Sequence, residues 1–360
     1  MPPHLVVDIS AHGFGHLAMT APVVEAVAHR VPGLKLTIRC AIPEAKLREM
    51  VRAPFEHIPR AFDIGMAMRD ALHIDVPASL AHYTTLHGDW SARVAAAADA
   101  LAALRPTVLL GNIPYLSIAA AAHAGIPAVA FCCLHWGEIF RHYCGDTAAA
   151  GGIEAEIRAA YASARVFLRP APGIPMPGLA NLVDIGPVGR VGALRRSGIV
   201  ERLGRPGTTR LALLSLGGVP FPLDVSGWPD LGEWVVVSGM PVAGRHPGVV
   251  PIERLGLPYI DVFASVEAVV AKLGYGTVAE AGVNGRPVLY VPRDGWPEEP
   301  HLAGWLASHG RCAPVAEADL LRGGFVAAME RLCASPAPES PEPTGVAEAA
   351  ARIVEMLARA

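Results

Sequence analysis

A glycine-rich turn in the second half of the chain contains the residue types that phosphate binding requires. Residues 268–271 have the apolar composition of a buried strand, and the letters K-L-G-Y-G-T-V-A-E follow them directly. Gly274 and Gly276 allow a sharp turn with unobstructed N–H groups, and Thr277 can cap the helix that follows. A helix start favours an anion such as a diphosphate, although similar turns also occur in α/β proteins that bind no phosphate.

Two adjacent carboxylates, Glu298 and Glu299, come after the next predicted strand at residues 288–292. Carboxylate oxygens accept hydrogen bonds from sugar hydroxyls, and His301 is near enough in sequence to join them. Acids are also favoured in the first turn of any helix by its dipole. The order of phosphate turn, strand and paired carboxylates predicts a site for a nucleotide-linked sugar.

A second glycine turn lies upstream, where a strand predicted to begin at residue 211 ends. Its hydroxyl and backbone amides are also suited to phosphate contacts. We therefore expect residues from both turns to hold the diphosphate together: Ser215, Gly217, Gly218, Gly274, Gly276 and Thr277.

One histidine has the position of a catalytic base. A strand predicted at residues 5–9 is followed by S-A-H-G-F-G-H and a helix predicted at residues 17–29. Gly13 and Gly15 permit a tight turn that places His16 near the helix start, in the first ligand-facing loop of a doubly wound sheet. The helix dipole disfavours imidazolium, so we expect a lowered pKa and a neutral imidazole that acts as a base. A turn histidine with a structural role is the alternative.

Together these motifs resemble those of the GT-B glycosyltransferases, which include the bacterial peptidoglycan N-acetylglucosaminyltransferase. They are most similar to the glycosyltransferase-like domain at the front of plant L-arabinokinases and in bacterial relatives. That domain has G-Y-G-T-V-x-E, an apolar strand, an R-D pair and E-E-P, which correspond here to residues 274–280, 293–294 and 298–300. Its first loop, G-H-G-F-G-H, matches residues 12–16. The resemblance implies an α/β GT-B fold, with two doubly wound Rossmann-like domains facing a central cleft, and a UDP-sugar donor.

Two departures from the family pattern concern the first half of the chain. Asn112 stands where the family has the aspartate of D-x-x-P, and Met19 stands where it has an arginine. If that aspartate orients a base, Asn112 alters or removes the chemistry. Glu138 ends an H-W-G-E that corresponds to the family's N-F-x-W-D, and we keep it as a catalytic candidate. An acid at a helix start is its plainer explanation.

A polar, histidine-rich passage occupies residues 54–90. Asp63, Gly65, Asp70 and Asp75 in this passage resemble a D-x-G and two spaced aspartates of the family, and we expect them on the acceptor side. The histidines lack the spacing with a carboxylate that would suggest zinc. A solvated face of loop and helix is the alternative.

The elements that must position these residues divide into two domains. Alternating strands and helices predict two doubly wound parallel sheets. We expect an N-terminal acceptor-side domain at residues 1–190 and a C-terminal donor-binding domain at residues 205–335, joined by a glycine- and proline-bearing linker. From the resemblance, we expect a helix at residues 344–360 that crosses back to the first domain.

The composition limits the classes of partner. A chain of 360 residues with a net charge of −3 has no basic excess, which argues against a nucleic-acid partner. No apolar run is long enough to span a membrane and no signal peptide is evident, so we expect a cytoplasmic protein. Its six cysteines lack metal or disulfide spacing, and the adjacent Cys132 and Cys133 lie in an apolar run that is typical of small core residues. No D-x-D motif occurs, which favours metal-independent transfer with the leaving group stabilised by helix dipole and amides, and we expect no cofactor.

These features predict a glycosyltransferase of hexosyltransferase type. It would transfer a sugar from a nucleotide-diphosphate sugar to a hydroxyl of a small molecule or glycoconjugate, with His16 as general base. The resemblance favours inversion at the sugar. Two alternatives stay open. One is a nucleotide-sugar hydrolase on the same fold, in which His16 activates water. The other is a non-catalytic nucleotide-sugar-binding protein, which Met19 and Asn112 favour.

Overall fold

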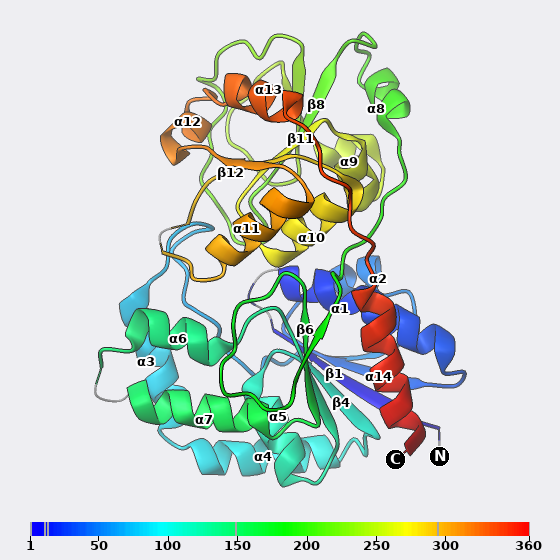
Figure 1. Cartoon of the computed structure of the whole chain (residues 1–360), viewed down its shortest axis with the longest axis vertical. Coiled ribbons are helices and arrows are strands. Elements are labelled where there is room, and N and C mark those ends of the chain that lie inside the picture. The colour runs from blue at the N-terminus through cyan, green and yellow to red at the C-terminus, as the bar shows by residue number, and fades with distance from the viewer. Residues whose placement is uncertain (1, 11, 13, 148–149, 294, 360) are drawn as a thin grey trace. The chain divides into compact units, whose positions relative to one another are not determined.

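The computed structural model describes residues 2–10, 12, 14–147, 150–293 and 295–359 (Figure 1). The chain forms two compact units. Unit 1 comprises residues 1–67, 74–188 and 343–360, and unit 2 comprises residues 68–73 and 189–342. Two short pieces of chain therefore belong to a different unit from their sequence neighbours, namely residues 68–73 and the terminal segment from residue 343.

Unit 1 is built on a seven-stranded parallel sheet of order β3-β2-β1-β4-β5-β6-β7. Its strands are β1 (His4–Ile9), β2 (Lys35–Arg39), β3 (Glu56–Ile58), β4 (Val108–Asn112), β5 (Ala128–Phe131), β6 (Val166–Pro170) and β7 (Leu182–Ile185). Leu5, Val6 and Val7 are fully buried, as expected for a parallel strand covered on both faces. The order reverses between β1 and β4, which is where doubly wound sheets bind ligands.

Helices cover both faces of this sheet. α1 (Gly15–Arg30), α2 (Glu44–Met50) and α14 (Gly345–Arg359) lie on one face, and α4 (Trp90–Ala102), α5 (Tyr115–His123) and α7 (Ala150–Ala162) on the other (Figure 1). α3 (Val76–His87) and α6 (Trp136–Cys144) pack against each other and against α7. The terminal helix α14, red in Figure 1, lies along α1 within unit 1.

Unit 2 has a six-stranded parallel sheet of order β10-β9-β8-β11-β12-β13, which reverses between β8 and β11. Its strands are β8 (Arg210–Ser215), β9 (Trp234–Ser238), β10 (Val249–Pro251), β11 (Ala268–Ala271), β12 (Val288–Tyr290) and β13 (Cys312–Pro314). Its helices are α8 (Arg196–Arg202), the short 3₁₀ helix η1 (Ile252–Leu255), α9 (Tyr259–Ser265), α10 (Tyr275–Asn284), α11 (Glu299–His309), α12 (Glu317–Leu321) and α13 (Val326–Ala334).

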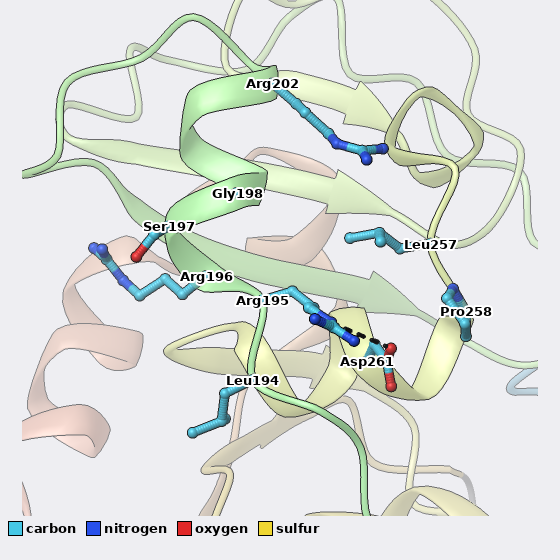
Figure 2. Close-up of a pocket in the computed structure, with 9 residues that line it drawn as sticks. All are labelled: Leu194, Arg195, Arg196, Ser197, Gly198, Arg202, Leu257, Pro258 and Asp261. Carbon is cyan, nitrogen blue, oxygen red and sulfur yellow. Dashed lines mark ion pairs between the residues drawn. The ribbon is translucent and has the colours of Figure 1, made fainter.

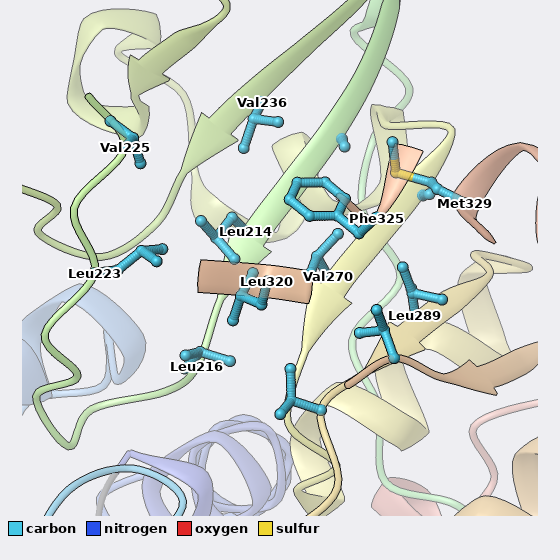
Figure 3. Packing of buried hydrophobic residues seen from close by; sticks show 14 of the residues in the cluster. Leu214, Leu216, Leu223, Val225, Val236, Val270, Leu289, Leu320, Phe325 and Met329 are labelled. Atoms are coloured by element: carbon cyan, nitrogen blue, oxygen red, sulfur yellow. The ribbon is translucent and has the colours of Figure 1, made fainter. Parts of the chain in front are cut away.

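The core of unit 2 follows from the alternation of side chains along its strands. Ala212 and Leu214 of β8 face a cluster that also contains Phe325 and Met329 around α13, whereas Leu211 and Leu213 are buried on the opposite face (Figure 3). Leu72, from the segment 68–73, belongs to the same cluster. Burial on both faces fixes the ends of β8 and β11, and these ends carry the predicted phosphate turns.

The predicted fold class is confirmed, since both units are doubly wound α/β structures with parallel sheets. Helix α10 ends as expected at Gly285, whose φ of 64° is in the left-handed region that glycine adopts readily. The strands β3 and β10 were not predicted, because three residues each are too few to show a pattern. In the described part of the chain, no helix is both long enough and apolar enough to cross a membrane.

Candidate functional site

His16 lies in the first turn of α1, at the point where the sheet of unit 1 reverses. Ile9 at the end of β1 pairs with Asn112 at the end of β4. The His16 Nδ1 atom lies 2.8 Å from Oδ1 of Asn112. An amide oxygen can only accept, so Nδ1 carries a proton in either charge state and Nε2 is the nitrogen that titrates. Asn112, which stands where the family has an aspartate, is therefore the residue that orients the predicted base His16.

The charge state of His16 differs from the sequence-based expectation. Cys132, which follows β5, has its Sγ 3.9 Å from His16 Nδ1. Burial lowers the pKa of His16, but the hydrogen bond and charge of Cys132, the hydrogen bond to Asn112 and the charge of Asp63 together raise the pKa to about 9. The expectation of a lowered pKa was wrong because it considered only the helix dipole. These contacts favour the protonated form of His16, and only its neutral form can act as a base.

Cys132 responds in the opposite direction. Burial raises the pKa of its thiol, but hydrogen bonds from Cys133 and His16, together with the His16 charge, lower the pKa to about 6. A buried thiolate and a buried imidazolium stabilise each other, so each favours the charged form of its partner. Sequence reasoning treated Cys132 as a small core residue. The feature that could have marked Cys132 as a site residue is its place at a strand end, beside the loop that carries His16.

Trp136 connects His16 to a carboxylate. Trp136 begins α6, is fully buried, and has its ring centroid 6.0 Å from that of His16. Its Nε1 donates to Asp63 Oδ2 at 3.0 Å. Asp63 also forms a side-chain hydrogen bond with Ser10, and its pKa is raised because burial outweighs these contacts. Of the acceptor-side candidates, Asp63 is the one whose carboxylate lies in the His16 cluster.

The neighbouring Gly65 has a steric reason to be glycine. Its φ is +54°, and a Cβ at this position would lie 2.7 Å from Nδ1 of His12. The His12 ring in turn packs edge-on against Trp136, with centroids 5.3 Å apart. Gly65 therefore lets the segment after β3 approach the loop of residues 10–16.

The remaining predicted carboxylates of the first half have local structural partners. Asp70 accepts from the backbone N–H groups of Leu72 and His73 at 2.8 and 3.0 Å, and it belongs to unit 2. Asp75 caps α3 by accepting from the N–H of Ala78 at 3.0 Å. These contacts are those of turn and cap aspartates.

Glu138 lies in the first turn of α6 and is occupied by two arginines. Its carboxylate accepts from Arg141 and, at 2.9 Å, from Arg158. The side chain is 10% exposed, and Arg158 also pairs with Glu154 at 3.0 Å. This network is typical of a structural residue, whereas the catalytic role of Glu138 stays a prediction, and the transfer step proposed below uses His16 alone.

The other first-loop residues contribute less. Gly15 begins α1, and a Cβ there would meet nothing within 4 Å in the described part of the chain. Gly13 lies outside the described residues, so its predicted role stays a prediction. Met19 is only 2% exposed and packs in the core of unit 1, where the family has an arginine.

In unit 2, the two predicted phosphate turns meet at the reversal of the sheet. Ser215 at the end of β8 pairs with Ala271 at the end of β11. Gly217 has a φ of +89°, which L side chains rarely adopt, and Gly218 follows it. The Ser215 hydroxyl is hydrogen-bonded to Tyr259. The first turn is therefore held at the end of β8, next to the strand that carries the second turn.

Helix α10 begins one residue after Gly274, which occupies the N-cap position without a side-chain cap. The prediction that Thr277 caps this helix was wrong, because the helix starts at Tyr275 and includes Gly276 and Thr277 in its first turn. The N–H groups of this turn have no intrahelical acceptor, as at every helix start. They remain suited to an anion.

Lys272 was missed by the sequence reasoning and lies between the two turns. A Cβ at Gly217 would lie 3.7 Å from its Nζ, as would a Cβ at Gly274. Within the described residues, the Lys272 ammonium forms no hydrogen bond or ion pair. Burial and the Arg293 guanidinium lower its pKa to about 7, against the attraction of two carboxylates. The sequence feature that could have identified Lys272 is a single cation at the end of a buried strand, directly before a glycine turn.

The two carboxylates that act on Lys272 are Glu298 and Glu299. Glu298 is buried, and its Oε2 accepts from Nε1 of Trp296 at 3.0 Å. Glu299 accepts from the backbone N–H of Arg293 at 3.1 Å, and burial raises its pKa against the charge of Arg293. They follow β12, the neighbour of β11. His301 is exposed on α11, and Asp294 lies outside the described residues.

Comparisons with known proteins agree with this architecture. The chain is 27% identical over 343 residues to L-arabinokinase of Arabidopsis thaliana. The match covers 90% of this chain and 31% of that protein, so the chain spans about a third of the relative's length. It superposes with a TM-score of 0.61 and 14% identity, over 99% of both chains, on a UDP-glucosyltransferase of Polygonum tinctorium capable of glucosylating indoxyl. The chain has the GT-B glycosyltransferase fold.

A second GT-B structure is the UGT89C1 protein of Arabidopsis thaliana in complex with UDP. It gives a TM-score of 0.61 at 12% identity, with 99% of this chain and 100% of that chain covered. No protein-family model matches the chain. The GT-B fold accounts for both sheet reversals at which His16 and Lys272 lie.

Unit 2 also has a cavity of about 640 Å³, whose lining includes neither Lys272 nor the glycine turns (Figure 2). Its lining includes three arginines of the segment around α8, and each has a partner. Arg195 pairs with Asp261 at 3.8 Å, Arg196 with Glu267, and Arg202 donates to the carbonyl of Leu255. Because its cations are engaged, we assign no ligand to this cavity.

Proposed function

We propose that the protein is a glycosyltransferase that moves a sugar from a nucleoside-diphosphate sugar to a hydroxyl acceptor. The observation that carries the proposal is the Lys272 ammonium between Gly217 and Gly274, which forms no hydrogen bond or ion pair within the described residues. This cation is partly withdrawn from water, and Glu298 and Glu299 attract it without a direct contact, so it favours an anionic ligand. Its place at a sheet reversal of a GT-B fold makes the diphosphate of the donor the best candidate.

The donor site uses the residues around this cation. Backbone N–H groups of the two glycine turns and the hydroxyls of Ser215 and Thr277 would donate to the phosphates, and Lys272 would neutralise their charge. Glu298 and Glu299 would accept hydrogen bonds from sugar hydroxyls. We propose UDP as the nucleotide, because a structure with the same fold was solved with UDP bound.

The chemical step uses His16. Its Nε2 would take the proton of the acceptor hydroxyl as the acceptor oxygen forms a bond to the anomeric carbon of the donor. The bond between that carbon and the diphosphate breaks at the same time, and its electron pair leaves with the phosphate oxygen. The cation and amides of unit 2 would stabilise this developing negative charge.

One observation favours a second function, that of a nucleotide-sugar-binding protein without turnover. Asn112 orients His16 but has no charge to stabilise an imidazolium, and its buried Nδ2 has no partner among the described residues. A protein that had kept the donor site and lost the chemistry would have this combination. Such a protein would bind the nucleotide sugar but release neither a transferred nor a free sugar.

Calorimetric titration with UDP, GDP, CDP and dTDP, followed by product analysis with the matching nucleotide sugars, tests the proposal. Gly276→Asp would place a carboxylate in the first turn of α10 and should abolish binding. Gly304→Asp, on the exposed part of α11 where a Cβ meets nothing within 4 Å, is the matched control and should retain it.

Four outcomes are distinguishable. Selective UDP binding with sugar transfer to an acceptor supports the glycosyltransferase. Release of free sugar in the absence of an acceptor indicates a hydrolase on the same fold. Binding without either product indicates the binding protein. If none of the four nucleotides binds, the assignment of the diphosphate site to unit 2 is wrong.

A further inference from the structure

Asn112 orients the His16 imidazole but carries no charge. Its Oδ1 accepts the Nδ1 proton at 2.8 Å, whereas its fully buried Nδ2 is unpaired within the described residues. A general base becomes a cation when it accepts a proton, and a buried cation needs a nearby anion. Proton transfer to His16 therefore depends on negative groups at positions other than 112, and Cys132, whose Sγ lies 3.9 Å from Nδ1, is one of them.

Asp63 lies where such a group is needed. It comes from the segment between β3 and α3, and its Oδ2 accepts from Trp136 Nε1 at 3.0 Å. The Trp136 ring packs against the His16 ring with centroids 6.0 Å apart. Ser10, directly after β1, also hydrogen-bonds to the Asp63 carboxylate. Trp136 and Ser10 together hold this carboxylate beside the imidazole.

We propose that Asp63 is a positioning residue for His16, whose carboxylate stabilises the imidazolium formed when His16 accepts the proton of the acceptor. The proposal rests on the proposed function, because it assumes that this proton transfer takes place. One proton moves from the acceptor oxygen to His16 Nε2, and Asp63 itself neither gains nor loses a proton. Asp63 would thus supply the negative charge that an aspartate at position 112 would otherwise supply. It does so from the segment after β3 rather than from β4.

Other titratable groups also surround His16. Cys132 approaches from the loop after β5, with Sγ 3.9 Å from Nδ1. His12, which comes from the same loop as His16, packs edge-on against Trp136. The charges of Cys132 and Asp63 both raise the pKa of His16. Conversely, the His16 charge favours the ionised form of Asp63 against burial. Removing Asp63 alone should therefore lower the pKa of His16 while the contribution of Cys132 remains.

The pKa of His16 can be measured directly, by NMR titration of the imidazole C–H signals without donor or acceptor. The variant His16→Gln identifies the signal among those of the 14 histidines. We expect Asp63→Asn to lower the pKa of His16 by about one pH unit, and Asn112→Asp to restore it in the double variant. Asp89→Asn removes an exposed carboxylate from unit 1 and should leave the pKa unchanged.

An unchanged His16 pKa in folded Asp63→Asn protein would overturn the proposal. If that variant does not fold, Trp136→Phe keeps an aromatic ring and removes the N–H that holds Asp63, and it should shift the pKa of His16 in the same direction. An unshifted pKa in folded Trp136→Phe would also contradict the role. The NMR titration contains no substrate, so its result does not depend on sugar transfer. Failure to detect transfer therefore counts against the proposed function alone. An unshifted His16 pKa in an active enzyme counts against the role of Asp63 alone.

Discussion

The Nδ1 atom of His16 lies 2.8 Å from Oδ1 of Asn112, where β1 and β4 end side by side. This contact engages Nδ1 and leaves Nε2 as the nitrogen that titrates. The Cys132 thiolate and Asp63 raise the pKa of His16 above that of an ordinary histidine. In this protein, Asn112 thus orients the His16 imidazole, whereas Cys132 and Asp63 supply the negative charge beside it.

The first prediction concerns the pH dependence of transfer. His16 has a pKa raised to about 9, and only its neutral form accepts a proton. Below that pKa, kcat/KM should therefore rise about tenfold per pH unit, and it should level off above it. Cys132→Ser removes the thiolate that raises the pKa, so the rising limb should move to lower pH. Initial rates from pH 6 to 10 measure both effects.

A limb centred near the ordinary histidine pKa, with no response to Cys132→Ser, would contradict this electrostatic account. His16→Ala provides the reference for loss of the base. We expect it to lower kcat by a factor of about 10² to 10⁴ while UDP affinity stays the same. Equal loss of nucleotide binding would indicate that His16 supports the fold rather than the chemistry.

The second prediction concerns Lys272. Lys272→Met should weaken UDP binding by about 10- to 100-fold, because one charge-assisted contact to phosphate is lost. Lys272→Arg should retain more of the affinity, since it keeps the cation. Burial and Arg293 lower the pKa of Lys272 to about 7, so UDP affinity should fall as pH rises above 7 and the ammonium deprotonates. Titration calorimetry measures the affinities.

Proton uptake gives an independent test of the same residue. Binding of a diphosphate should shift Lys272 towards its protonated form, so UDP binding near pH 7 should take up protons from the buffer. Calorimetry in two buffers of different ionisation enthalpy measures this uptake. Wild-type affinity and unchanged proton uptake in Lys272→Met would place the phosphate elsewhere. Lys35→Met, an exposed lysine of unit 1, is the control for loss of a positive charge.

Sequence reasoning predicted the fold class and the glycine turns at two strand ends because their signals are local. Apolar strands that end in glycine turns mark both β8 and β11, and Gly285 marks the end of α10. The start of α10 was misplaced because Gly274 is the N-cap residue and Thr277 lies within the first turn. A helix can begin at any of several residues after such a turn, and packing decides between them.

The charges around His16 could not be predicted, because they come from distant parts of the chain. Asp63 and Cys132 are separated from His16 by long stretches of sequence, and only the folded sheet brings them together. The family resemblance drew attention to Asn112 as a lost carboxylate. It gave no indication that Asp63 lies beside the same imidazole.

The third prediction concerns the buried ion pair that supports the end of β1. Arg39 donates twice to Asp8, at 2.7 and 2.6 Å, and both side chains are at most 3% exposed. Asp8→Ala would leave the guanidinium buried without its partner, which should cost about 3–5 kcal/mol of unfolding free energy. Urea unfolding followed by fluorescence and circular dichroism measures the loss.

The exposed pair Lys46–Glu49 serves as the matched control. Glu49→Ala should change the unfolding free energy by less than about 1 kcal/mol, because a solvated ion pair contributes little. A small effect of Asp8→Ala, similar to that of Glu49→Ala, would show that water reaches Arg39 in the variant. The Asp8–Arg39 pair would then not be the element that fixes the strand before the His16 loop.

The fourth prediction separates two roles for Glu138. Its carboxylate accepts from both Arg141 and Arg158, and within the described residues it forms no hydrogen bond or ion pair with His16, Asp63 or Cys132. Glu138→Gln keeps the shape and removes the charge, so we expect a loss of about 1.5–3 kcal/mol in unfolding free energy.

If Glu138 is structural, kcat per folded molecule stays within about twofold of the wild type, because the free energies of the chemical step are unaffected. A fall in kcat of about 10² or more, with stability retained, would instead assign Glu138 to the reaction, as the family resemblance suggested. Arg158→Gln removes one partner of the carboxylate and should reproduce the stability loss under the structural role alone.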